Sequence, residues 1–319
     1  MLILAGDIGG TKSWLQAIDL DDAERVVAQA KYVSQAFESL DAIIQTFCAE
    51  FQLSHFEAAC FGLPGPVAGR QAELTNLPWQ IDADQLQSHC HIKRVELIND
   101  FQAAAFGIDA LSDDQLITLY PGDFDGRGNR LVVGAGTGLG VAPVVRCMDG
   151  FWPQPCEGGH MDFAPEDESQ QSLLKWFWQC WPHVSYERVL SGAGIEALYA
   201  FFADLSATDH QAWLSAPRVH QLAEEGDPVA VKALTTFVEV YGGYIGNLAL
   251  LWPARAGVYI AGGIASKIEQ WMRKKEFLFC LHNKGRMQKL VMSMPVYLVK
   301  DESLGLKGAS VRAVRLAGH

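Results

Sequence analysis

The sequence predicts an α/β protein built from two lobes. Three observations support this: short apolar strands alternate with helical patterns, a strand–glycine turn–strand unit occurs near residue 10 and again near residue 137, and no Pro-rich or Ser-rich linker divides the chain. At roughly 150 residues per domain, 319 residues are enough for about two domains. We therefore expect two lobes with a cleft between them rather than domains separated by a linker.

The chain opens with a predicted β-hairpin. Leu2–Ala5 is an apolar run, Gly9-Gly10 supplies a tight turn, and Trp14–Ile18 continues as a second strand. Apolar residues between Phe37 and Phe51 then recur every three or four positions, which is typical of an amphipathic helix.

Two further strands are expected in the first half. Glu57–Gly62 is an apolar run that ends in the turn-forming cluster Gly62–Pro66, and Val95–Ile98 is a short strand that stops at Asn99-Asp100. These strands alternate with helical patterns, as expected for an α/β lobe.

The strand pattern restarts after about residue 110. Leu131–Val133 leads into a glycine-rich segment over 134–140, and Val141–Val145 continues as a strand. This unit resembles the first hairpin in design. The remaining predicted helices are Ser169–Gln179, Ser185–Leu190, Gly194–Phe202, Pro228–Leu251 and Leu304–Leu316, and the remaining predicted strands are Gly257–Ala261 and Val296–Val299.

Composition argues against several classes of protein. A formal net charge of -12 lacks the basic footprint of a nucleic-acid binder or of a protein held on anionic membranes. The seven cysteines include no C-x-x-C pair, and Cys156 and His160 have no further metal ligands at suitable spacing, so we expect reduced thiols and no zinc site. No signal peptide or membrane-spanning stretch is expected, which indicates a cytoplasmic protein.

Two glycine-rich turns are candidates for phosphate binding. In Gly6-Asp7-Ile8-Gly9-Gly10-Thr11 the glycines let a hairpin approach phosphate oxygens, and Asp7 could order water around a magnesium ion. An ordinary hairpin turn explains this segment equally well. In Gly134–Gly140, which contains Gly136-Thr137-Gly138, alternate glycines weaken a strand and therefore favour close approach to a ligand. Neither segment matches a Walker A or dinucleotide-binding motif.

The other candidate residues are individually ambiguous. Asp100, beside Asn99 at a strand end, could accept a proton from a hydroxyl, but such residues are more often helix caps. Glu157, His160 and Glu187 could bind a polyol, although lone residues of these types are usually solvated or structural. Gly262-Gly263 could lie against a nucleotide or simply form a strand-to-helix turn.

Taken in order, these motifs resemble the bacterial glucokinase family of the sugar-kinase and actin-like ATPase superfamily. The resemblance covers essentially the whole chain. It is most specific in three stretches: Gly134–Val141, Glu157–His160 with Asp162–Pro165, and Glu187–Gly192. Lys12 stands where many bacterial glucokinases have Asn, but the cysteine-rich zinc motif of the related ROK kinases is absent, and Met161-Asp162-Phe163 stands there instead.

The resemblance implies a two-lobed actin-like ATPase fold, also called ribonuclease H-like, with a nucleotide and sugar cleft between the lobes. Residues 1–110, completed by the C-terminal helix 303–319, would form the small lobe, and residues 111–302 the large lobe. Closure of the lobes would exclude water. Family members are commonly homodimers, so a homodimer is expected.

The same resemblance implies ATP-dependent phosphorylation of glucose at its 6-hydroxyl, the entry step of glycolysis, with Mg²⁺ and without structural zinc. Asp100 would be the general base, and Asp7 would hold the metal through water. The sugar would be held by Asn99, Asp100, Glu157, His160 and Glu187. The nucleotide would be held by Gly6, Asp7, Ile8, Gly9, Gly10, Thr11, Gly136, Thr137, Gly138, Gly262 and Gly263.

Two alternatives remain open at this point. One is a kinase for another hexose or an amino sugar. The other is a non-catalytic, sugar-responsive regulator, but such ROK regulators carry a DNA-binding helix-turn-helix ahead of the kinase-like body. Here the first hairpin begins at Leu2, and the chain is acidic, so we expect an enzyme with no nucleic-acid partner.

Overall fold

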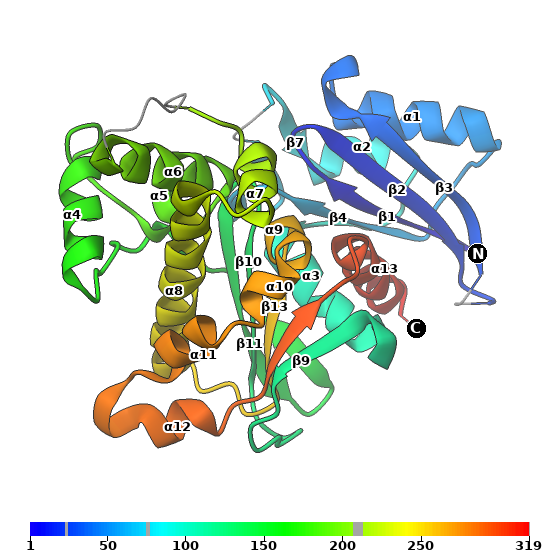
Figure 1. Cartoon of the computed structure of the whole chain (residues 1–319). Helices are drawn as coiled ribbons and strands as arrows, with labels where there is room; N and C mark the ends of the chain where they lie inside the picture. The colour runs from blue at the N-terminus through cyan, green and yellow to red at the C-terminus, as the bar shows by residue number, and fades with distance from the viewer. Residues whose placement is uncertain (23–24, 75–76, 207–212, 319) are drawn as a thin grey trace. The chain divides into compact units, whose positions relative to one another are not determined.

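The computed structural model describes residues 1–22, 25–74, 77–206 and 213–318 (Figure 1). Contacts within the chain divide it into two compact units. Unit 1 comprises Met1–Asp113, Trp152–Pro155 and Asp301–His319, and unit 2 comprises Asp114–Phe151 and Cys156–Lys300. His319, which ends the predicted C-terminal helix, lies outside the described residues.

Unit 1 contains a five-stranded sheet of order β3-β2-β1-β4-β8. β1, β2 and β3 form an antiparallel meander, and β4 and β8 add to β1 in parallel. A second, three-stranded sheet has the order β5-β6-β7. The strands are β1 (Leu2–Ile8), β2 (Lys12–Asp19), β3 (Val26–Val33), β4 (Ala58–Leu63), β5 (Val67–Ala68), β6 (Gln71–Glu73), β7 (Gln80–Asp82) and β8 (Val95–Asn99).

Four α-helices complete unit 1: α1 (Leu40–Phe51), α2 (Ala83–His89), α3 (Asp100–Gly107) and α13 (Leu304–Ala317). Three 3₁₀ turns connect its elements: η1 (Ser34–Ala36), η2 (Ile108–Ala110) and η3 (Asp113–Gln115), the last of which continues into unit 2. The predicted helix from Phe37 begins instead at Leu40, because Ser39 caps it by accepting a hydrogen bond from Ala42 N–H.

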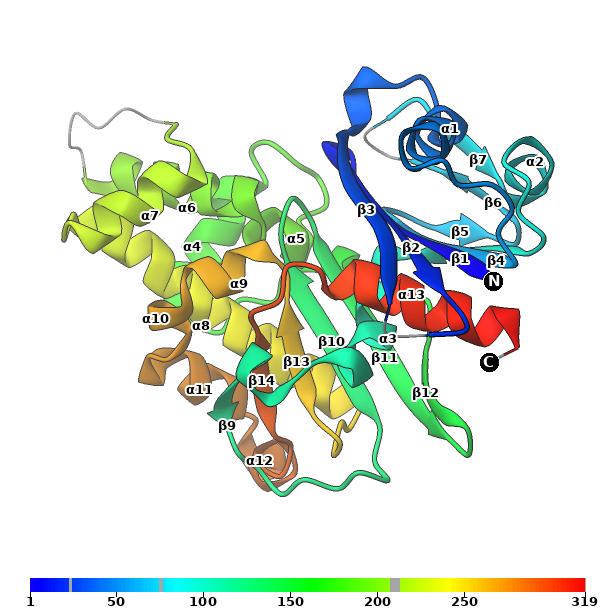
Figure 2. The ribbon, with the colours of Figure 1, turned by 90° about the vertical axis from the view of Figure 1, so that its right-hand side faces the viewer.

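The C-terminal helix α13 is part of unit 1 and lies against α3, β1 and β4 (Figure 2). The backbones of α3 and α13 are in direct contact. A Cβ atom at Gly107 of α3 would overlap the Leu304 carbonyl oxygen, and a Cβ atom at Gly308 of α13 would overlap the Ala103 carbonyl oxygen, so both positions need glycine. Small residues in the predicted C-terminal helix therefore serve the close packing that the sequence indicates.

Unit 2 is built on a six-stranded sheet of order β12-β11-β10-β13-β14-β9. As in unit 1, an antiparallel hairpin (β10 and β11) is followed by strands that add in parallel (β13 and then β14). The strands are β9 (Leu116–Tyr120), β10 (Arg130–Ala135), β11 (Leu139–Cys147), β12 (Gly150–Pro153, whose last two residues belong to unit 1), β13 (Val258–Ala261) and β14 (Val296–Val299).

The helices of unit 2 pack around α8, which begins where Asp227 accepts a hydrogen bond from Ala230 N–H at 2.8 Å and Pro228 occupies the first helical position. Its buried residues belong to the largest hydrophobic core of the chain. The helices are α4 (Glu168–Phe177), α5 (Tyr186–Val189), α6 (Gly192–Ser206), α7 (Ala216–Glu224), α8 (Pro228–Leu251), α9 (Gly263–Lys267), α10 (Glu269–Met272), α11 (Lys275–His282) and α12 (Gln288–Met292), with 3₁₀ turns η4 (Gly158–His160) and η5 (Gly285–Met287).

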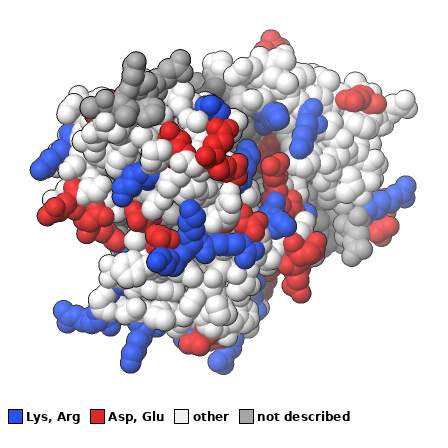
Figure 3. Space-filling view, viewed as in Figure 1, with Lys and Arg blue, Asp and Glu red and all other residues white. Residues whose placement is uncertain are grey.

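On the face drawn in Figure 3, Lys and Arg are interspersed with Asp and Glu. Within the described residues, no helix is both long enough and apolar enough to cross a membrane.

Candidate functional site

The first glycine turn joins β1 to β2. Gly6, Asp7 and Ile8 end β1, and Gly9, Gly10 and Thr11 form the turn. The Gly9 N–H donates to the Lys12 carbonyl at 2.9 Å, and a Cβ atom at Gly9 would lie 2.9 Å from that same oxygen. A side chain at Gly9 would therefore force this turn open.

Ser34 supports the turn and was not predicted from the sequence. Its buried hydroxyl donates to the Gly9 carbonyl at 2.7 Å, its N–H donates to the Thr11 carbonyl at 3.0 Å, and its Oγ lies 2.9 Å from Ser13 Oγ. Two carbonyls of the turn are thus fixed from η1. No local pattern marks Ser34, because its partners are more than twenty positions away.

Asp7 points its carboxylate into protein rather than solvent. The residue keeps some exposed surface, but desolvation of the carboxylate raises the pKa of Asp7 to about 6. Among the described residues, none donates a hydrogen bond to it. A Cβ atom at Gly305, in the first turn of α13, would lie 2.9 Å from Asp7 Oδ2, so glycine there leaves room for the carboxylate. An uncompensated carboxylate suits a hydrated magnesium ion.

Asn99 and Asp100 lie where β8 ends and α3 begins. Asn99 is the cap: its Oδ1 accepts from Phe101 N–H at 2.9 Å, and its own N–H donates to Gln102 Oε1 at 3.1 Å. Its Nδ2 also donates to the Gly65 carbonyl at 3.1 Å. Asp100 is the first helical residue, and its Oδ1 accepts from the same Phe101 N–H at 2.9 Å. The sequence left open that these residues only cap a helix. In the structure the cap is chiefly Asn99.

Gly62 of β4 brings Asp100 close to the first hairpin. A Cβ atom at Gly62 would lie 3.7 Å from Asp100 Cα and 3.8 Å from the Gly6 carbonyl oxygen. Gly62 ends the predicted strand Glu57–Gly62, and in the structure it lies within β4, paired with Asp7 and Ile98. The tight contact is with α3: a Cβ atom at Gly62 would lie 2.8 Å from Ala103 Cβ, so glycine there lets α3 pack closely on β4.

The second glycine turn joins β10 to β11 and is shorter than its glycine pattern. Gly134 and Gly140 face each other within the two strands, so only Gly136, Thr137 and Gly138 form the turn. It is closed by a hydrogen bond from Gly136 N–H to the Gly138 carbonyl at 2.8 Å. Gly134 is required because a Cβ atom there would lie 2.5 Å from the Ala261 carbonyl oxygen on β13.

Gly262 and Gly263 follow β13, next to the second turn. Gly262 has a φ of 85°, and a Cβ atom there would lie 2.6 Å from the Ala135 carbonyl oxygen. Gly263 begins α9 and is exposed. The structure thus brings together these two predicted nucleotide-binding segments at the ends of neighbouring parallel strands.

The three predicted sugar-binding residues of unit 2 lie on two joined segments. Glu157 precedes η4 and His160 ends it, and both are exposed, whereas Glu187 is half-buried on α5. The segments are joined by a bridge between Asp162 and Ser185, with Phe163 N–H donating to the Val184 carbonyl at 2.9 Å. Residues 27 to 30 positions apart are thereby held on one part of the unit.

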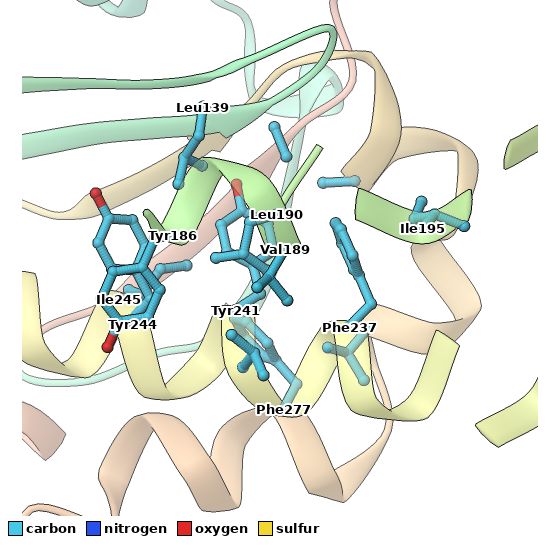
Figure 4. Packing of buried hydrophobic residues seen from close by; sticks show 14 of the residues in the cluster. Leu139, Tyr186, Val189, Leu190, Ile195, Phe237, Tyr241, Tyr244, Ile245 and Phe277 are labelled. Atoms are coloured by element: carbon cyan, nitrogen blue, oxygen red, sulfur yellow. The ribbon is translucent and has the colours of Figure 1, made fainter. Parts of the chain in front are cut away.

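Glu187 also bonds to the second turn, which the sequence does not predict. Its Oε2 accepts from Leu139 N–H at 2.8 Å. The side chain of Leu139 enters the core beside Tyr186, Val189 and Leu190 of the α5 segment (Figure 4). The residue expected to be an isolated carboxylate on a helix surface is therefore attached to the glycine turn.

Substitution of Gly136 by valine is expected to weaken nucleotide binding sharply, because the added side chain would block approach of phosphate to the backbone. A Cβ atom at Gly136 meets no protein atom within 4 Å, so the turn itself tolerates it. Isothermal titration with ATP measures the effect. Gly9→Val should weaken binding as well, and unchanged affinity in both variants would contradict the assignment of the two turns.

Two absences bear on metals. All seven cysteines are thiols, and within the described residues no group of three or more His, Cys, Asp or Glu side chains is arranged to hold a metal ion. Any magnesium at Asp7 would therefore be held largely by water and by phosphate oxygens of the nucleotide.

The chain is similar to known proteins over almost its whole length. The family model described as Glucokinase matches residues 4–316. The glucokinase of Nostoc sp. (strain PCC 7120) is 36% identical over 340 residues, covering 99% of each chain. The crystal structure of a glucokinase from an Antarctic psychrotroph superposes with a TM-score of 0.86 at 29% identity, covering 98% of this chain and 99% of that one.

A more distant likeness extends to the fold alone. The ROK family glucokinase from Streptomyces griseus, solved in complex with glucose and AMPPNP, has a TM-score of 0.63 at 21% identity and covers 99% of this chain and 100% of that one. The predicted two-lobed, actin-like ATPase fold is confirmed by these neighbours. With a family model spanning nearly the whole sequence and full-length relatives above 30% identity, the chain belongs to the glucokinase family.

Proposed function

We propose that this protein transfers the γ-phosphoryl group of ATP to the 6-hydroxyl of glucose, with Asp100 as the general base. That it is a glucose kinase follows from its family. The observation that carries the mechanism is the position of Asp100: a carboxylate in the first turn of α3, directly after β8 and beside Gly62 of β4, which pairs with Asp7 of β1. The N-terminal end of a helix favours the ionised form of a carboxylate, which is the form that can accept a proton.

In this proposal each part of the chain has one task. The backbone N–H groups of the turns at Gly9–Thr11 and Gly136–Gly138 bind phosphate oxygens, and Gly262-Gly263 lies against the nucleoside. Asn99, Asp100, Glu157, His160 and Glu187 hold the sugar hydroxyls, and Asp100 takes the proton of the 6-hydroxyl. Mg²⁺, held through water by Asp7, supplies charge stabilisation on the phosphates when bound.

Substrate choice is tested by a coupled ADP-release assay with glucose, mannose, fructose and N-acetylglucosamine. Glucose should give the highest kcat/KM, and the product should carry phosphate on oxygen 6, which ³¹P–¹H correlation spectra identify. A higher kcat/KM for N-acetylglucosamine or fructose would favour the alternative of a kinase for another sugar. Absence of turnover with all four sugars would favour the regulator.

Glu157→Ala is expected to raise the KM for glucose tenfold or more with a smaller effect on the KM for ATP. A hydrogen bond to a charged group contributes about 1.5–3 kcal/mol, and about 1.4 kcal/mol corresponds to a factor of ten. Steady-state kinetics with each substrate varied measures both constants. Wild-type glucose affinity in this variant would place the sugar elsewhere.

The setting of the enzyme is part of the same proposal. We assign the enzyme to the cytoplasm, with which its seven reduced cysteines are consistent. We also assign it as a homodimer. Each chain would have a small lobe made of residues 1–110 and 303–319 and a large lobe made of residues 111–302. Its role would be to supply glucose 6-phosphate to glycolysis. Sedimentation equilibrium tests the dimer.

A further inference from the structure

We propose that Glu187 is a positioning residue that couples sugar binding to nucleotide binding, beyond its expected contact with the sugar. This inference rests on the proposed function, because it needs the sugar at Glu187 and the phosphates at the Gly136–Gly138 turn. Its basis is the hydrogen bond from Leu139 N–H to Glu187 Oε2 at 2.8 Å, which attaches a sugar-binding side chain to the first residue of β11, directly after the nucleotide turn.

The carboxylate of Glu187 lies directly over the turn. A Cβ atom at Gly138 would lie 2.6 Å from Glu187 Oε2, so only glycine at that position leaves room for the contact. The other end of the turn is fixed from the start of α6, where Gly192 N–H donates to the Gly136 carbonyl at 2.9 Å. α5 and the start of α6 are thus attached to the two ends of the turn.

The second sugar-binding segment touches the same residue. A Cβ atom at Gly159, in η4, would overlap the Leu139 carbonyl oxygen. Leu139 therefore has its N–H bonded to Glu187 and its carbonyl against the segment that carries Glu157 and His160. A shift of either segment must move the peptide groups that follow Gly138.

Glu187 has the chemistry to serve both substrates at once. Oε2 accepts from Leu139 N–H, and among the described residues nothing donates a hydrogen bond to Oε1. The residue is half-buried, and in this proposal a sugar hydroxyl donates to Oε1. A hydroxyl bound to Oε1 would restrict the rotation of the side chain and so strengthen the hold of Oε2 on Leu139 N–H. Bound glucose should then leave the turn better ordered for phosphate.

Linkage requires that glucose and nucleotide raise each other's affinity by one common factor. We expect the Kd of AMPPNP in the presence of Mg²⁺ to fall by roughly 5-fold to 150-fold at saturating glucose, the range typical of coupled sites. Isothermal titration of the full chain, with and without glucose, measures this coupling factor. The reverse titration, glucose with and without AMPPNP, must give the same factor.

Two variants at the turn separate coupling from binding. Gly138→Ala keeps the Glu187 carboxylate but pushes it off Leu139 N–H, so the coupling factor should fall to between one and two. Gly136→Ala is the matched control, because a Cβ atom there meets no protein atom within 4 Å and does not approach Glu187. Nucleotide affinity itself can change in both variants, but the coupling factor should be lost only in Gly138→Ala.

Substitutions at the carboxylates provide a second comparison. Glu187→Ala should also abolish the coupling, whereas Glu157→Ala should weaken glucose binding and retain the wild-type factor once glucose is saturating. If Gly138→Ala and Glu187→Ala both keep the coupling factor of the wild type, the role of Glu187 is overturned. It is overturned as well if the wild-type protein phosphorylates glucose but has a coupling factor of one. A wild-type protein that binds neither ligand would instead overturn the proposed function, and the coupling with it.

Discussion

Asp100→Asn is expected to lower kcat by about 10²–10⁴-fold, the typical contribution of a positioned general base. Asparagine keeps the size of the side chain and an oxygen that can accept the hydrogen bond from Phe101 N–H, but it cannot take the proton of the sugar hydroxyl. Both substrates should therefore still bind. Single-turnover phosphoryl transfer, with the Kd of glucose and AMPPNP measured separately, distinguishes lost chemistry from lost binding.

Asn99→Ala is the matched control for that experiment. Asn99 caps α3, and losing an N-cap costs about 1 kcal/mol of stability, so this variant should unfold at a lower temperature. If Asp100 served only to begin the helix, Asp100→Asn would keep the wild-type rate and stability, because asparagine can still accept the hydrogen bond from Phe101 N–H. A stable Asp100→Asn protein that turns over glucose at nearly the wild-type rate would end the general-base assignment.

Asp7→Asn is expected to stabilise the protein at neutral pH while reducing turnover by about 10²-fold or more. Burial raises the pKa of Asp7 well above the ordinary value of an aspartate, to about 6, so the folded state binds the proton more tightly than the unfolded state. The contribution of Asp7 to the free energy of unfolding is therefore present at low pH and is lost as the pH rises through 6. The ionised carboxylate then costs up to about 3 kcal/mol, which asparagine removes.

Urea denaturation of both proteins at pH 5 and pH 7.5 tests the sign. The gain in the free energy of unfolding on substitution should be larger at pH 7.5, where Asp7 of the wild type is ionised. Turnover should fall because a metal ion contributes several kcal/mol of charge stabilisation and the amide holds its water shell more weakly. An asparagine variant that is less stable at pH 7.5 would show that the carboxylate is already compensated within the protein.

Local patterns predicted the scaffold of the candidate site well. Both hairpins were marked by glycines between apolar runs, and α8 was predicted with its observed bounds because Asp227 and Pro228 mark its start and the pattern ends at Leu251. β3 was missed because it is the edge strand of its sheet, and only Ala28 of it is buried. In an edge strand with little buried surface, apolar and polar residues do not alternate clearly along the sequence.

What the sequence could not predict depends on contacts between distant residues. Ser34 and the bond between Glu187 and Leu139 join segments 21 to 48 positions apart, and neither has a composition that marks it. The second glycine turn is shorter than its glycine pattern for the same reason, namely contacts between residues that are apart in the sequence. Gly134 and Gly140 read as turn residues, but pairing with each other and the neighbouring β13 keep them in the sheet. Propensity is local, whereas strand pairing is not.

The place of α13 in unit 1 affects how the chain folds during synthesis. The apolar face formed by Ile3, Ile18, Ala58 and Cys60 is covered by α13, which begins about 190 residues after Asp113, the end of the N-terminal segment of unit 1. At roughly 5–20 residues per second, a ribosome needs on the order of ten to forty seconds to make that intervening stretch. Unit 2 is finished first, and the nascent N-terminal sheet must keep an uncovered face out of aggregates until the last helix emerges.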